Sequence, residues 1–283
     1  MKNKHFEVMN SFKKIIFPVL VIISTIACER IAFDPGIEIL NEELPVVYGI
    51  LGKHPDYRTI ELTRTAPYMD GSKIATIDNA EVTVSDEQTT YSFEWIGNGQ
   101  YIAPENFQPG IDTTYYLNIE IDEEVYAAQS IMPPSVNMHS LKVQKDRWET
   151  DDNNIYEVTG WVKDNEREDE RFLFKYTIND IRYDSVQVWS HYTDQLSNNL
   201  WLEDAQLFGN IEANPGDTID VYALSVSTEY YNFVQAAEKN RVSANPFTPP
   251  PGVPITGNIR NGALGIFQVS AIVQQTVTVP QKE

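Results

Sequence analysis

The stretch that decides the fold class covers residues 110–134 and reads "GIDTTYYLNIEIDEEVYAAQSIMPP". Its first half has an apolar side chain at every second position, at Tyr115, Leu117, Ile119 and Ile121. Because the side chains of a β-strand alternate between its two faces, this period predicts a strand with one buried face. The polar residues 122–124 predict a turn, and the chain then returns as a second strand through Val125.

The segments before this hairpin show the same period. Ile60 and Leu62 alternate with polar residues in "YRTIELTRTAPY", and Val82 and Val84 do so in "NAEVTVSD". Strands of this length and spacing are typical of a sandwich of two sheets. We therefore expect residues 43–133 to form an N-terminal β-sandwich of the immunoglobulin/transthyretin-like kind.

Two local features agree with a sandwich. Asn98 and Gly99 in "YSFEWIGNGQYIA" tolerate positive φ and so predict a type I′ hairpin turn. Gly110 precedes the inward-facing Tyr115 by five positions, which resembles the tyrosine corner of immunoglobulin-like sandwiches. In such a corner the tyrosine hydroxyl bonds back to the preceding loop.

A second β-rich part follows. Pro133 and Pro134 remove hydrogen-bond donors and stiffen the chain, so we place a domain boundary there. Alternation resumes in "IYEVTGWV", "RFLFKYTI" and "GDTIDVYALSVS". We expect residues 134–283 to form a second antiparallel β domain, which makes the fold mainly β.

One segment of this second part has a helical period instead. "STEYYNFVQAAEKN" begins with Ser227 or Thr228 as the N-cap and predicts a helix over about residues 228–240. Its apolar residues at helical spacing are Tyr230, Phe233, Val234 and Ala237. We interpret this stripe as a face packed on a sheet, with a binding surface as the alternative.

The N-terminus has the pattern of a targeting segment. Lys13 and Lys14 precede "IIFPVLVIISTIA", an apolar run of 13 residues. A membrane-spanning helix takes about 20 residues. The run therefore indicates a signal peptide over residues 1–27, with Met9 as an alternative start to Met1.

Cys28, the single cysteine, follows this run directly. The small residue Ala27 before it fits cleavage of a bacterial lipoprotein, in which the cysteine thiol then carries a diacylglycerol thioether. Ile26 and Thr25 depart from the commoner residues of that site, and a secretory peptide with a chance cysteine nearby is the alternative. We predict that Cys28 is the lipid-attachment site, that residues 28–42 are a tether, and that the lipid holds the protein to a membrane. An internal disulfide is excluded.

The chain is acidic, with a formal net charge of −20 at pH 7. It has no basic stripe, so we expect no nucleic-acid binding. We interpret the charge as a solvated surface, with divalent-cation binding as the alternative. The acidic intervals "WETDDNN" and "KDNEREDE" lack the ligand spacing of a calcium hand and are expected to be exposed loops.

The sequence contains no local catalytic signature. His54, His139 and His191 are isolated in sequence, so no local zinc motif is present. There is no Gly-x-Ser-x-Gly elbow and no phosphate-binding glycine loop. We therefore predict no catalytic residues, no metal site, no cofactor and no enzymatic activity. A glycosidase-like carboxylate pair stays open, because such a pair forms in space rather than in sequence.

Five tryptophans are the remaining candidates for binding, although the sequence assigns no ligand-binding residue. They are Trp95, Trp148, Trp161, Trp189 and Trp201. We favour a place in the core over sugar stacking. Several tryptophans lining one open groove would favour sugar binding, and burial of all five would exclude it.

Several stretches together resemble a known family. They are "VVYGIL", "ELTRTAPYMDGSK", "NAEVTVSD", "YYLNIEIDEEVYAAQSIMPP" and "ANPFTPPPGVPITGNIRNGALGIFQVSAI". This order is similar to that in a family of Bacteroidota lipoproteins, domain of unknown function 4249. The most specific parts are residues 245–247, Asn258-Ile259 and residues 262–267, where members more often have two glycines in place of Gly262 and Ala263.

The resemblance implies an outer-membrane lipoprotein whose gene often neighbours that of a TonB-dependent transporter, with no established enzyme activity. In this phylum, acidic residues after the cysteine promote transfer to the cell surface. Here only Glu29 precedes Asp34, with Arg30 between them. We still favour the cell surface over the periplasmic face.

These observations lead to one expected function and two alternatives. We expect a non-enzymatic accessory or binding subunit of an outer-membrane β-barrel, a TonB-dependent transporter in nutrient uptake. The alternatives are a surface lipoprotein that binds glycans or other ligands directly, and a structural subunit of an outer-membrane assembly complex. The proline-rich residues 246–254 are interpreted as a rigid connection or as a stiff docking loop for the barrel.

Overall fold

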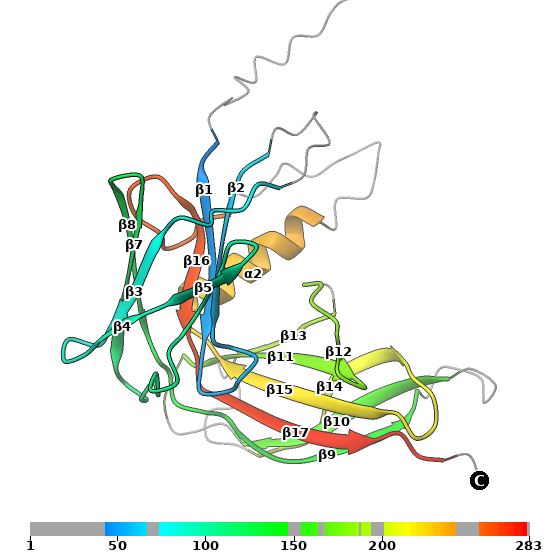
Figure 1. Cartoon of the computed structure of the whole chain (residues 1–283). Coiled ribbons are helices and arrows are strands. Elements are labelled where there is room, and N and C mark those ends of the chain that lie inside the picture. The colour runs from blue at the N-terminus through cyan, green and yellow to red at the C-terminus, as the bar shows by residue number, and fades with distance from the viewer. Residues whose placement is uncertain are drawn as a thin grey trace, which may run out of the picture. The chain divides into compact units, whose positions relative to one another are not determined.

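The computed structural model describes residues 43–66, 74–146, 154–163, 167, 169–186, 188–193, 201–241 and 255–281. The predicted signal peptide, Cys28, the tether, Trp148 and residues 246–254 lie outside this set. The fold is mainly β, with several antiparallel sheets and, among the described residues, one helix (Figure 1). This confirms the predicted fold class.

The first part is a sandwich of two sheets. One sheet has the order β16-β1-β2-β6-β5, with the strands β1 (Pro45–Leu51), β2 (Thr59–Arg64), β5 (Glu94–Gly97), β6 (Gln100–Ile102) and β16 (Leu264–Val269). The other has the order β4-β3-β7-β8, with the strands β3 (Glu81–Ser85), β4 (Thr90–Ser92), β7 (Thr114–Ile121) and β8 (Glu124–Ile131).

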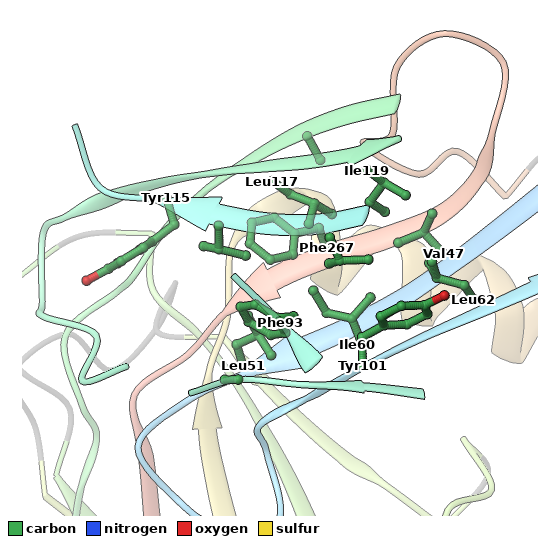
Figure 2. Packing of buried hydrophobic residues seen from close by; sticks show 14 of the residues in the cluster. Val47, Leu51, Ile60, Leu62, Phe93, Tyr101, Tyr115, Leu117, Ile119 and Phe267 are labelled. Atoms are coloured by element: carbon green, nitrogen blue, oxygen red, sulfur yellow. The ribbon is translucent and has the colours of Figure 1, made fainter. Parts of the chain in front are cut away.

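The apolar side chains of the predicted alternating pattern fill the space between these two sheets. Tyr115, Leu117, Ile119 and Ile121 on β7 are all buried. They share one apolar cluster with side chains from the facing sheet, among them Val47, Leu51, Ile60 and Leu62. Figure 2 shows Phe267 of β16 among side chains from both sheets.

The local predictions for this sandwich are confirmed. Asn98 and Gly99 have φ of 52° and 70° in the turn between β5 and β6, as a type I′ turn requires. The turn after β7 has positive φ at Asp122 and Glu123. The backbone N–H of Gly110 donates to the Tyr115 hydroxyl at 2.8 Å, which is the bond of a tyrosine corner.

The second part also has two sheets. One has the order β14-β10-β9, with the strands β9 (Asn137–Lys145), β10 (Ile155–Lys163) and β14 (Trp201–Glu212). The other has the order β12-β11-β15-β17, with the strands β11 (Arg171–Ile178), β12 (Ile181–Arg182), β15 (Thr218–Ser225) and β17 (Ile272–Thr278), and β13 (Ser190–Thr193) also pairs with β11. All these pairings are antiparallel, and one apolar cluster draws side chains from both sheets.

The helix α2 (Thr228–Arg241) confirms the predicted range within a residue. Ser227 is its N-cap, because its side-chain oxygen accepts the N–H of Tyr230 at 3.2 Å. Tyr230 and Val234 are buried in a cluster with Ile50 of β1 and Leu173 of β11. The aromatic stripe of α2 is therefore a packing face.

The strand β16 differs from the predicted division of the chain. It lies within the residues predicted for the second part, but it pairs in parallel with β1 of the first sandwich, with Val47 opposite Gly265. The next strand, β17, returns to the second part. Apolar alternation cannot reveal this crossover, because a strand has the same period in either sheet. The boundary at Pro133 and Pro134 itself stays a prediction.

Asn258, one of the residues most specific to the family resemblance, holds β16 in place together with the nearby Asn261. The Asn258 side chain accepts the N–H of Phe267 at 2.9 Å and donates to its carbonyl oxygen at 2.8 Å, as a neighbouring strand would. The Asn261 side chain donates to the Val125 carbonyl on β8 at 2.7 Å. These amides link the last part of the chain to β8 and close one side of the sandwich.

The acidic interval "KDNEREDE" was expected to be an exposed loop, and its end is not. Arg167 and Asp169 are exposed, whereas Glu170 is only 8% exposed. Glu170 directly precedes β11, whose residues are nearly all buried. Glu170, the last acidic residue of the interval, is therefore buried because it adjoins a buried strand.

Candidate functional site

The candidate site is a cavity of about 450 Å³ that the sequence did not predict. Its walls come from β1, the loop after it and β2 on one side, and from β11, β12, Asp184 and Trp189 on the other. Ligand cavities are commonly found where two packed units meet. Its lining combines aromatic and charged side chains: Tyr48, Asp56, Tyr57, Glu61, Lys175, Arg182, Asp184 and Trp189.

Lys175 is the buried charge of this cavity. On β11, Phe174 and Tyr176 lie in the core of the second part, so Lys175 points from the opposite face of the strand. That face is covered by the cluster that contains Tyr57 and Trp189, and Lys175 is only 6% exposed. A lysine is rarely buried to this degree unless it is paired.

Two aromatic rings lie beside the ammonium group of Lys175. Its Nζ lies 3.7 Å from the centroid of the Trp189 ring and 5.9 Å from that of Tyr57. Among the described residues, the structure gives Lys175 no hydrogen-bond acceptor. Burial lowers the pKa of Lys175 to about 7, Asp184 opposes this shift and Arg182 adds to it.

Arg182 and Asp56 join the two sides of the cavity. The guanidinium Nη2 lies 3.0 Å from the Asp56 carboxylate and donates to its backbone carbonyl at 3.3 Å. The Arg182 guanidinium also lies 5.5 Å from the centroid of the Tyr57 ring. With both side chains about 40% exposed, the pair orients the loop before β2 more than it stabilises the fold.

Tyr48 and Tyr57 of the cavity wall and their neighbour Tyr230 are neutral. Burial raises the pKa of Tyr57 and of Tyr230, so both phenols keep their protons at neutral pH. The hydroxyls of Tyr48 and Tyr230 lie 3.4 Å apart and link β1 to α2. The carboxylates Glu61 and Asp184 are exposed, whereas Lys175 is buried. The cavity thus has a cation inside and carboxylates at its rim.

Replacing Lys175 with methionine is expected to stabilise the protein at low pH. The pKa of Lys175 is about 7 when folded and near its ordinary 10.5 when unfolded, so the unfolded chain binds more protons between these values. The lysine therefore costs stability fully below pH 7, and the cost disappears as pH approaches 10.5. We expect a gain of about 2 to 4 kcal/mol at pH 6.

Urea unfolding of both proteins between pH 6 and 10 measures this difference. The matched control is Lys142→Met, which removes an exposed lysine on β9 and should change the free energy of unfolding little at any pH. An advantage of Lys175→Met that did not shrink with rising pH would contradict the assigned burial.

A larger cavity, of about 480 Å³, lies beside Pro133 and Pro134 and is a weaker candidate. Arg167 donates to both carboxylate oxygens of Asp112 at 2.6 Å, and this hydrogen bond lowers the pKa of Asp112. Both side chains are more than half exposed. Because these two charges are already paired with each other, they offer a ligand less than the buried Lys175 does.

The four described tryptophans are neither all buried nor all exposed. Trp95, Trp161 and Trp201 are 50%, 40% and 44% exposed, and Trp189 is 8% exposed. Trp161 and Trp201 both contact His139, with ring centroids 6.4 Å and 5.8 Å from it. They form an exposed aromatic cluster on the sheet β14-β10-β9, while Trp95 lies on β5 of the first sandwich.

The histidines do not come together. His54 contacts Gln274 at 2.8 Å, and His191 lies 3.6 Å from the Glu238 carboxylate. In the described part of the chain, no group of three or more His, Cys, Asp or Glu side chains could hold a metal ion. None of the described helices is long and apolar enough to cross a membrane.

Comparisons with known proteins found one family. The model described as Domain of unknown function (DUF4249) matches residues 31–276, which is most of the chain. The curated proteins contain no match to this sequence.

Proposed function

The chain belongs to the DUF4249 family of domains of unknown function, and from this premise we propose that it is a non-enzymatic lipoprotein of the outer membrane. In this proposal it acts as an accessory or binding subunit of an outer-membrane β-barrel, a TonB-dependent transporter in nutrient uptake. The lipid on Cys28 holds it there, on the cell surface rather than on the periplasmic face.

One observation carries the proposal: Cys28 follows Ala27 and an apolar run that is preceded by two lysines. A small residue before the cysteine is what the lipoprotein peptidase needs, and several acyl chains hold a protein stably at a bilayer. The likeness to lipoproteins encoded beside transporters supports the choice of partner.

The exposed edge strand β5 of the first sandwich supports a role in binding proteins. The strand β5 ends its sheet, so one backbone edge faces outward in the described part. Trp95 and Ile96 on this strand are 50% and 53% exposed. An edge strand with apolar side chains is suited to pairing with a partner's strand.

Purification of the native protein in mild detergent, followed by mass spectrometry, tests the proposal. We expect a β-barrel protein to be recovered with it. The variant Ile96→Glu should lower this recovery several-fold, because it puts a charge on the proposed contact. Ile181→Glu is the matched control, since Ile181 is 65% exposed on β12. Recovery of the protein as a lone monomer would count against the partner, and an assembly factor in place of a transporter would favour the structural role.

Direct glycan binding is the second candidate, and the aromatic cluster of His139, Trp161 and Trp201 favours it. Exposed indole rings offer flat apolar faces on which sugar rings stack. Lys163 lies 5.8 Å from the centroid of the Trp201 ring and adds a hydrogen-bond donor beside it. This candidate needs no barrel partner.

The double replacement Trp161→Ala and Trp201→Ala is expected to weaken binding about tenfold or more to any polysaccharide that slows the parent protein in a gel. Loss of a buried aromatic anchor commonly costs over 1 kcal/mol. Affinity electrophoresis in gels containing soluble polysaccharides measures the effect. Trp95→Ala, which removes an equally exposed indole elsewhere, should leave migration unchanged. Equal migration of all three proteins in every gel would reject glycan binding by this cluster.

A further inference from the structure

The ammonium of Lys175 faces a cavity without an acceptor from the described protein. The Trp189 ring lies 3.7 Å from it, and a ring attracts the positive charge but does not accept the three N–H donors of an ammonium as oxygen atoms do. Lys175 is only 6% exposed, so little water reaches its ammonium group, and a charged donor with few hydrogen bonds is costly. An acceptor oxygen inside the cavity would remove that cost.

The other charged side chains that line the cavity are Asp56, Glu61, Arg182 and Asp184. Arg182 is already paired with Asp56 at 3.0 Å. Glu61 and Asp184 have no such partner among the described residues, and both are exposed at the rim. Asp184 is close enough to Lys175 to shift its titration. Once the Arg182 pair is set aside, one buried cation faces two carboxylates at the rim.

This arrangement selects against a simple anion. The carboxylates at the rim, together with a net charge of −20, would repel a ligand that carries negative charge alone. A molecule with a negative end for Lys175 and a positive end for Asp184 and Glu61 is complementary to both. The volume of about 450 Å³ is within the range of small-molecule sites.

We propose that this cavity binds a free amino acid, with its carboxylate on Lys175 and its ammonium group at the rim beside Asp184 and Glu61. The side chain of the ligand lies against Tyr48 and Tyr57. This goes beyond the proposed function, because it assigns a small-molecule site that needs neither a barrel nor a lipid.

Thermal unfolding of the full-length protein with each of the twenty common L-amino acids tests the proposal. A ligand that binds only the folded state raises the Tm. We expect at least one amino acid to do so. The analogues of that amino acid that lack the carboxylate or lack the amine should each raise the Tm much less; for phenylalanine these are phenethylamine and 3-phenylpropionate.

Two variants locate the site by calorimetry. Lys175→Met and Asp184→Asn should each weaken binding of the best amino acid about tenfold or more, which is the effect of losing about 1.4 kcal/mol. Lys175→Met is expected to be more stable than the parent at neutral pH, so lost binding would not reflect unfolding. Asp204→Asn, at an exposed position on β14, is the control.

The proposal is overturned if no amino acid raises the Tm, if the carboxylate-free analogue binds as well as the amino acid, or if Lys175→Met binds as the parent does. Recovery of a barrel from native membranes is measured separately. Its failure would reject the proposed function and leave the amino-acid site standing.

Discussion

Replacing Gly265 with alanine is expected to lower the free energy of unfolding by about 4 kcal/mol or more. Gly265 has φ of +106°, and a Cβ atom there would lie 1.9 Å from the carbonyl oxygen of Val47. That oxygen belongs to the backbone of β1, so no side-chain rotation can relieve the contact. The strand β16 would have to move away from β1, and Ile266 and Phe267, both fully buried, would lose their packing.

Gly262→Ala is the matched control for this change. Gly262 also has positive φ, at +92°, but no atom lies within 4 Å of its added Cβ. We expect it to cost about 1 to 2 kcal/mol, the backbone penalty alone. Urea unfolding of both variants at pH 7, followed by tryptophan fluorescence, measures the difference. Equal losses in the two variants would contradict the close approach of β16 to β1.

Replacing Cys28 with serine is expected to release nearly all of the protein from the membrane fraction. Serine cannot form the diacylglycerol thioether, and the acyl chains contribute about 0.8 kcal/mol for each buried CH₂ group. Sedimentation of lysed cells and the intact mass of the purified protein measure the effect. The parent should be heavier than its polypeptide by the mass of the lipid.

Glu29→Gln is the matched control for this change, because it alters the neighbouring residue and keeps the thiol. It should stay in the membrane fraction with the lipid attached. If Cys28→Ser sediments with the membranes and has the mass change of the parent, Cys28 is not the anchor. Protease treatment of intact cells that carry the parent protein then tests whether it faces the outside.

Local patterns predicted the strands, turns and helix well because each depends on few neighbouring residues. The alternation over residues 115–121 fixed which side chains of β7 are buried. Asn98 and Gly99 fixed a turn through their tolerance of positive φ, and Ser227 began α2 by capping it. Each of these depends on residues within about five positions along the chain.

The candidate site could not be found in this way. In "RFLFKYTI", Lys175 occupies a polar position of an alternating strand, which normally faces water. Here the opposite face of β11 is covered as well, by Tyr57 from the loop after β1 and by Trp189. A lysine flanked by large apolar residues on both sides was the one signal, and it did not reveal what would cover it.

The sequence by itself determined the mainly β fold class, the hairpins of the first sandwich and the helix, and it predicts the anchor at Cys28. Only the tertiary structure decided that residues 264–269 cross back to β1 and that Lys175 is buried against Trp189. The physical reason is the range of the interactions. Periodicity and turn geometry are local properties of the chain, whereas strand partners and burial depend on residues far away in sequence.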